Sequence, residues 1–115
     1  MLNRARAKEG LGALRRDQGL DRVARAHAKA MITAGRVAHE AGDGTPSERV
    51  HAALVPAIRV GENVASAPTV RRVHQALWNS PSHRANMLDS TFDRVGVALV
   101  ASTGGKLWAV QLFAR

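Results

Sequence analysis

The chain of 115 residues contains no cysteine and no tyrosine, and aromatic residues make up only 3% of it. The absence of cysteine excludes disulfide bonds, thiolate metal sites and a cysteine nucleophile. The scarcity of aromatic side chains argues against a protein that binds single-stranded nucleic acid by base stacking. No apolar run reaches the length of a membrane-spanning helix. These absences leave a globular protein as the expected class of protein. The chain is long enough for one domain and too short for two.

Acidic residues are also few, with 9 Asp and Glu against 17 Lys and Arg, so the formal net charge is +8. A basic chain attracts nucleic acid, anionic lipid or cell-wall polymers. The arginines, however, are spread from Arg4 to Arg115 without a block of five or more, which favours an ordinary solvated surface. A basic module that binds anionic lipid or nucleic acid is one hypothesis, with nucleic acid the less expected partner.

Apolar periodicity predicts five helices, over residues 2–9, 18–34, 46–55, 69–78 and 81–88. Three of their ends carry capping signals. Asp17 is placed to cap the second helix, and Gly35 to end it in the left-handed conformation. Thr45 and Glu48 form a capping box around Pro46 at the start of the third.

Two strands, over 94–101 and 106–114, flank a Ser-Thr-Gly-Gly hairpin signal. Both faces of these strands are apolar, so the sheet needs cover on both sides. A short strand over 57–60 is expected to lead into a corner at residues 61–63. We therefore predict an α+β fold, a three-layer α-β-α sandwich with a small antiparallel sheet.

Three polar residues are the candidates for a site: His39, Glu62 and His83. Two imidazoles and one carboxylate can ligate a zinc-type ion and leave a fourth position open. The three are more than twenty residues apart, so only the fold can bring them together. Glu62 has an alternative role as a helix cap. His27, on the apolar face of its helix, is expected to be a core histidine bonded to a backbone carbonyl.

Several motifs in order resemble the bacterial branch of the CAP superfamily, the cysteine-rich secretory protein, antigen 5 and pathogenesis-related group. They are Gly61-Glu62-Asn63-Val64-Ala65, Trp78-x-Ser80-Pro81-x-His83-Arg84-x-Asn86-Met87-Leu88 and Phe92-x-x-Val95-Gly96-Val97-Ala98. The resemblance covers nearly the whole chain and implies one CAP (SCP-like) domain over 1–115. It also implies an α-β-α sandwich, export, and a surface cleft lined by His39, Glu62 and His83 that holds Zn²⁺ or another divalent ion.

The chain departs from the plant and animal pattern of that group. Pro81 and Ser82 stand where a second glutamate is common, and the cysteine pairs are absent. A fourth protein ligand is therefore not expected, and functions tied to a cysteine-rich tail do not carry over.

The first functional hypothesis is an exported CAP domain, secreted or in the cell envelope, whose export signal has been removed. Its cleft would bind a divalent ion, with a small ligand, a lipid or a cell-wall component as partner. The alternative is a metal-assisted hydrolase of peptide or cell-wall material with Glu62 as the base. No glycine-framed serine or Ser-His-Asp order is visible, and Glu62 cannot easily be both ligand and base. The residues favour binding over catalysis, and no catalytic residue is assigned.

Overall fold

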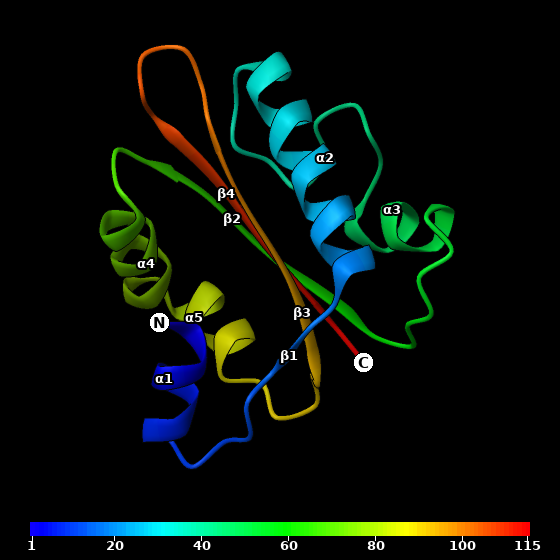
Figure 1. Ribbon diagram of the computed structural model, residues 1–115, viewed down its shortest axis with the longest axis vertical. Helices are drawn as coiled ribbons and strands as arrows, with labels where there is room; N and C mark the ends of the chain where they lie inside the picture. The colour runs from blue at the N-terminus through cyan, green and yellow to red at the C-terminus, as the bar shows by residue number, and fades with distance from the viewer.

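A computed structural model describes residues 1–115 and contains five helices and four strands (Figure 1). Their order is α1 (Leu2–Lys8), β1 (Arg15–Arg16), α2 (Gln18–Ala34), α3 (Pro46–Ala52), β2 (Val60–Ala67), α4 (Val70–Asn79), α5 (Pro81–Met87), β3 (Arg94–Ala101) and β4 (Leu107–Ala114). The five predicted helices are all present, and their ends lie within a few residues of the predicted ones.

The four strands form one sheet in the order β1-β3-β4-β2. The hairpin β3–β4 is antiparallel, and β2 lies antiparallel to the other edge of β4. The two-residue strand β1, which the sequence did not predict, pairs in parallel with β3. The sheet is thus antiparallel apart from this short addition at one edge.

Strand β2 corrects the expectation of a strand over 57–60 followed by a corner. It spans Val60–Ala67, so Glu62 and Asn63 lie inside a strand, opposite Leu112 and Gln111 of β4. Glycine, glutamate and asparagine favour turns or helices over strands. These residue types therefore led the sequence analysis to miss a strand, whose polar residues are buried and held by hydrogen bonds.

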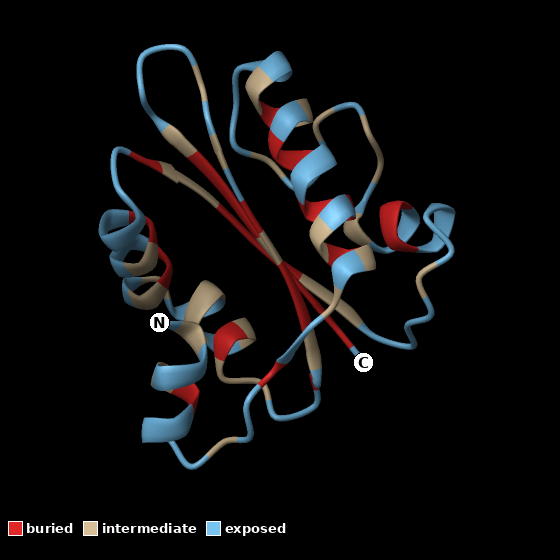
Figure 2. Cartoon of the chain, in the orientation of Figure 1, coloured by how far each residue is buried: buried red, intermediate tan, exposed pale blue.

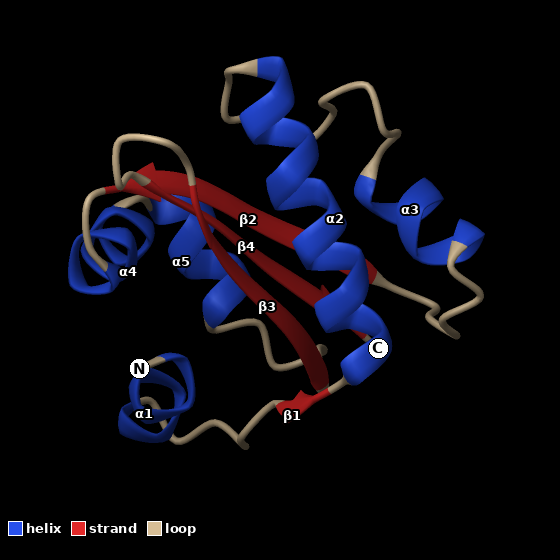
Figure 3. Ribbon diagram, turned by 45° about the horizontal axis from the view of Figure 1, so that its top comes forward, coloured by secondary structure: helices blue, strands red, loops and turns tan.

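Helices cover both faces of the sheet, which confirms the three-layer prediction (Figure 3). Successive residues of β4 face opposite layers: Val110 and Leu112 belong to the apolar cluster under α2 and α3, whereas Ala109 and Phe113 belong to the one under α4 and α5. In Figure 2 the buried residues accordingly follow the centre of the sheet and the inner sides of the helices. The two-sided apolar strands are explained by this double cover.

Helix α2 packs very closely on β3. A Cβ atom at Gly96 would lie 2.2 Å from the backbone carbon of Leu20, so only glycine allows this approach. The Asp21 carboxylate on the same helix accepts a hydrogen bond of 2.9 Å from the Val97 amide. Backbone contact and hydrogen bond together fix α2, and hence the loop that follows it, against the sheet.

The predicted helix ends are confirmed. Asp17 accepts from the Leu20 amide, Gly35 has the left-handed φ of 70°, and Thr45 with Glu48 completes the capping box. Ser80 is the N-cap residue of α5, but its side chain makes no capping hydrogen bond.

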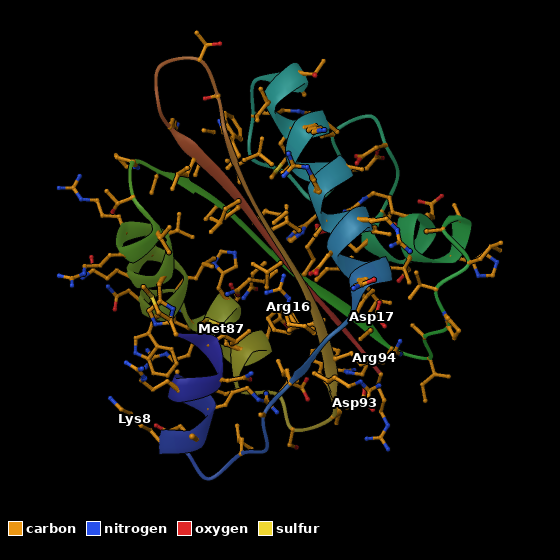
Figure 4. All side chains as sticks on the ribbon, in the orientation of Figure 1. Lys8, Arg16, Asp17, Met87, Asp93 and Arg94 are labelled. Carbon is orange, nitrogen blue, oxygen red and sulfur yellow. The ribbon has the colours of Figure 1, made fainter.

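Arg16, Asp17, Asp93 and Arg94 gather where β1 joins β3 (Figure 4). The Arg94 guanidinium lies 3.8 Å from Asp17 and 3.5 Å from Asp93. These partly exposed pairs sit beside the parallel two-residue ladder. No helix of the chain has the length and apolar character needed to cross a membrane.

Candidate functional site

The fold brings the three predicted residues to one region from three different elements. His39 lies in the loop after α2, Glu62 is the third residue of β2, and His83 is in the first turn of α5. The side chain of His39 is 54% exposed, whereas that of Glu62 is fully buried. Glu62 is thus the buried centre of the group, and His39 reaches it from the surface.

The Glu62 carboxylate has partners at both oxygens. Its Oε1 accepts from Arg49 Nη2 at 2.9 Å and lies 3.0 Å from His39 Nδ1. Its Oε2 lies 2.8 Å from Arg49 Nη1, in poor hydrogen-bond alignment, so this second contact is an ion pair. A buried carboxylate needs such compensation. The structure therefore shows Glu62 as an acceptor for His39 and a counter-ion for Arg49.

The bond to Glu62 sets the state of the His39 ring. A carboxylate paired with a guanidinium accepts hydrogen bonds, so the proton of the bond resides on His39 Nδ1. Nε2 is then the nitrogen left for a ligand when the ring is neutral. A histidine whose second nitrogen is held by a carboxylate is the usual arrangement of a metal-binding imidazole.

Arg49, which the sequence analysis did not select, holds the loop that carries His39. Its guanidinium donates to the His39 carbonyl at 2.9 Å and to the Gly44 carbonyl at 3.2 Å. The available signal was indirect: a glutamate buried in a strand requires a cation, and Arg49 lies beside Val50 on the buried side of α3. The periodicity of α3 alone does not identify it.

His27 and Asp43 extend this charged cluster into the core. The fully buried His27 ring has Nε2 at 2.8 Å from the Ala38 carbonyl and Nδ1 at 2.7 Å from Asp43 Oδ2. The first contact confirms the predicted core histidine. Since a carbonyl only accepts, Nε2 is the donor of the bond to Ala38, and Nδ1 lies against the Asp43 carboxylate. Both ring nitrogens of this buried histidine thus have polar partners.

The Asp43 carboxylate is stabilised in its ionised form by its neighbours. Burial by itself would raise the pKa of Asp43, but hydrogen bonds from His27 and the Ala41 amide lower it overall, together with the charges of His27 and Arg49. The cluster therefore sets the His27 ring and the Arg49 guanidinium against two carboxylates, Asp43 and Glu62. This balance explains how so many charged groups are tolerated beside the core.

A pair of asparagines fastens α5, and with it His83, to β2. Asn63 donates to the His83 carbonyl at 3.0 Å, and Asn86 donates to Asn63 Oδ1 at 2.9 Å and to the Glu62 carbonyl at 3.3 Å. Both asparagines thus tie backbone segments together. Their bonds join the start of α5 to the strand segment that carries Glu62.

The His83 ring is partly buried, and its Nδ1 has no hydrogen-bond partner. Burial lowers the pKa of His83, and the nearby charge of His39 lowers it further. His83 is therefore kept in the neutral form that a metal ion requires. His83 thus lies close enough to His39 for the charge of one ring to affect the pKa of the other.

The chain contains no group of three or more His, Cys, Asp or Glu side chains arranged to hold a metal ion. The assignment of His39, Glu62 and His83 as ligands stays a prediction, and Glu62 already has partners at both oxygens. Nor do these residues line any of the four hollows of the surface. The largest of these, about 670 Å³, lies alongside, between α2 and α3, with Asp43 and Arg49 in its wall.

Acid–base catalysis finds little basis in this geometry. The two oxygens of Glu62 that would act as a base are held by Arg49 and His39. Ser80 and Ser82 make their only side-chain contact with each other, at 3.5 Å.

Known proteins of the same architecture match the chain along its length. The model of the cysteine-rich secretory protein (CAP) family matches residues 1–113. The protein YkwD of Bacillus subtilis strain 168 is 31% identical over 117 residues, covering 100% of this chain and 45% of YkwD. The chain thus spans less than half of that relative.

Two solved structures show the same fold at higher than 25% identity. An outer surface protein of Borrelia burgdorferi superposes with a TM-score of 0.92 at 27% identity, over 99% of this chain and 86% of the Borrelia protein. An extracellular SCP-domain protein of Bacillus anthracis gives 0.91 at 28% identity, over 99% of this chain and 37% of its own. The matches agree with the motifs and with the α-β-α layers. The chain belongs to the CAP family, the cysteine-rich secretory protein family, although it has no cysteine of its own.

Proposed function

We propose that this CAP domain acts outside the cytoplasm as a binding domain, and that His39 and His83 bind a divalent ion of the zinc type. The observation that carries the proposal is the 3.0 Å contact between His39 Nδ1 and Glu62 Oε1. It fixes a half-exposed imidazole with its other nitrogen free. Two relatives, an outer surface protein and an extracellular protein, support the location.

In this proposal Glu62 acts through His39 instead of binding the ion directly. A cation at the carboxylate would face the Arg49 guanidinium, which lies 2.8 Å from Oε2. Hydrogen-bonded to His39, the same carboxylate orients the ring and raises its basicity as a ligand. Glu62 is thus a positioning residue, supported in turn by Arg49.

Two imidazoles leave the remaining positions of a four-coordinate ion to water or to an incoming ligand. When bound, the ion would supply a Lewis-acidic contact for an oxygen of a small ligand or a cell-wall component. The chain's own contribution is to hold His39 by Glu62, to keep His83 neutral by burial, and to fix the two elements by Arg49 and the Asn63–Asn86 pair.

Calorimetric titration with zinc chloride tests the proposal. Wild type should give saturable heat, and His39→Ala and His83→Ala should each weaken binding at least about tenfold, because each removes a ligand. Glu62→Gln should weaken zinc binding about tenfold, because His39 Nδ1 loses the carboxylate that orients its ring. His51→Ala, which removes an exposed histidine outside the site, is the matched control. Equal heats from wild type and His83→Ala would exclude the site.

A further inference from the structure

The last residue of α3 and the segment that leads from it towards β2 expose an unusual run of apolar side chains. Residues 52–58, here called the apolar loop, read Ala-Ala-Leu-Val-Pro-Ala-Ile without one polar side chain. Six of the seven are exposed, and only Val55 packs against the core. Leu54 is 88% and Ile58 87% exposed, more than any other large apolar residue of the chain. In Figure 2 the loop runs in pale blue from the end of α3 towards β2.

The backbone of the loop is held in a conformation that turns Leu54 outward. Leu54 has φ of 59° and is the only residue other than glycine with positive φ. A bulky side chain is disfavoured in this left-handed region, where a helix normally ends in glycine. Leu54 therefore adds backbone strain and gains almost no packing within the domain. Both features are unfavourable unless the side chain has a partner outside the domain.

The end of the loop is tied firmly to the sheet. The amides of Ile58 and Arg59 donate to the Arg115 carbonyl at 2.6 and 3.3 Å, and the Arg115 amide donates back to the Arg59 carbonyl at 3.0 Å. The other end is tied to α3, where Val55 donates to the Val50 carbonyl at 3.3 Å. The loop thus presents its aliphatic side chains from a fixed frame.

Cationic side chains border the apolar loop. Arg59 follows the apolar loop directly, and its side chain is 54% exposed. Arg115, which is also exposed, is hydrogen-bonded through its backbone to the backbone of Ile58 and Arg59. No acidic residue lies between His51 and Val60, although Glu48 of α3 lines the same surface hollow as Ile58 and Arg59. One Arg59 nitrogen contacts Asp89 at 2.8 Å, and Arg115 Nη1 donates to the Thr91 carbonyl at 3.4 Å.

From these observations we propose that the apolar loop is a membrane-docking surface whose Leu54 and Ile58 side chains enter the interface of an anionic phospholipid bilayer. The aliphatic side chains suit the boundary of the acyl chains. The neighbouring arginines suit the phosphate headgroups. The net charge of +8 attracts the whole domain to such a surface. A protein-binding hot spot would more commonly contain an aromatic anchor, and residues 52–58 contain none. The inference is independent of the proposed metal site.

The test is sedimentation of the 115-residue chain with vesicles of equal parts phosphatidylglycerol and phosphatidylcholine. We expect wild type to bind these vesicles at least about tenfold more strongly than pure phosphatidylcholine. Leu54→Gly and Ile58→Ser should each reduce binding about fivefold to tenfold, because each removes buried aliphatic surface. Leu54→Gly also relieves the positive φ, so its thermal unfolding midpoint should equal or exceed that of wild type.

Val70→Ser, at the start of α4, removes a 45% exposed valine far from the loop in sequence and serves as the control; its vesicle binding should equal that of wild type. Failure of wild type to sediment with the anionic vesicles overturns the proposal. So does equal sedimentation of both loop variants and wild type. A dimer of the free chain that dissociates on Ile58→Ser, without vesicle binding, would instead assign the loop to self-association.

Discussion

Two buried arginines, one on each side of the sheet, are held in opposite ways. Arg6 of α1 is 2% exposed and donates only to carbonyls, those of Gly12 at 2.8 Å and of Met87 and Asp89 at 3.0 Å. Burial lowers the pKa of Arg6, which the Asp89 charge partly offsets by raising it. Arg6 is thus a tie between three chain segments, with no carboxylate directly bonded to its guanidinium.

Arg49 of α3 is 9% exposed, and its guanidinium lies against the carboxylates of Glu62 and Asp43 at 2.8 and 3.6 Å. Its loss would remove the guanidinium from the fully buried Glu62 and leave only the rings of His39 and His27, at 3.0 and 3.7 Å. A buried cation among carbonyls therefore serves the fold, whereas a buried cation among carboxylates also sets the charge of the site. The comparison predicts that the Arg49 region is more sensitive to mutation than the Arg6 region.

The largest effect is expected for Arg49→Met. Removing one partner of a buried ion pair costs about 3–5 kcal/mol, because the other charge stays buried. Urea denaturation at neutral pH measures the loss. The double variant Arg49→Met/Glu62→Gln removes both charges and should recover a substantial part of it. A double variant no more stable than Arg49→Met would show that the pair is not the source of the loss.

Arg6→Met should have a smaller effect, a loss of about 2–3 kcal/mol, since it leaves carbonyl groups with fewer donors but no isolated charge. The same urea experiment checks it, and zinc binding by calorimetry should stay unchanged. A loss greater than that of Arg49→Met would reverse the comparison between the two regions.

Acid should affect the Arg49 region through Asp43. The pKa of Asp43 is lowered in the folded state, so its contribution to stability is complete above the ordinary value of 3.8. That contribution is lost as the pH falls below this value and through the folded-state pKa. Asp43→Asn should flatten the dependence of unfolding free energy on pH in this window. Glu9→Gln, which changes an exposed carboxylate of the Arg6 side, should leave the slope as in wild type.

The smallest effect concerns His83. Its pKa is lowered by burial and then by the charge of His39, so its ring should titrate below the ordinary value of 6.5 in NMR spectra. His39→Ala should move the midpoint upward but not restore it fully, because burial remains. A wild-type midpoint at or above the ordinary value would contradict the partly buried placement of the ring.

The apolar half of the structure could be predicted from sequence, and the charged half could be predicted only in part. Periodicity and capping residues locate α2 between Asp17 and Gly35, since both signals are local. Two-sided apolar strands imply two helical layers, because each face needs cover. Strand β2 was misplaced because Glu62 and Asn63 contribute no apolar alternation.

Family motifs indicated His39, Glu62 and His83, and the fold does bring them to one region. The partners that decide their chemistry carry no local signal. Arg49 and Asp43 are ordinary surface types in the sequence, and the burial of Arg49 and the partial burial of Asp43 depend on how loop 38–44 folds against them. The expected role of Glu62 as a ligand depends on whether its oxygens are free, and only the tertiary contacts of Arg49 and His39 answer that.

The central claim is that Glu62, neutralised by Arg49, holds His39 so that it and His83 present imidazole nitrogens to one ion. Long-range ¹H–¹⁵N spectra of the five histidine rings during a zinc titration test it most directly. A proton on Nδ1 of His39 is expected before zinc is added, followed by ring-nitrogen shifts confined to His39 and His83, with Nε2 of His39 among them. Shifts at His51 or His74 instead, or rings of His39 and His83 that do not respond, would contradict it.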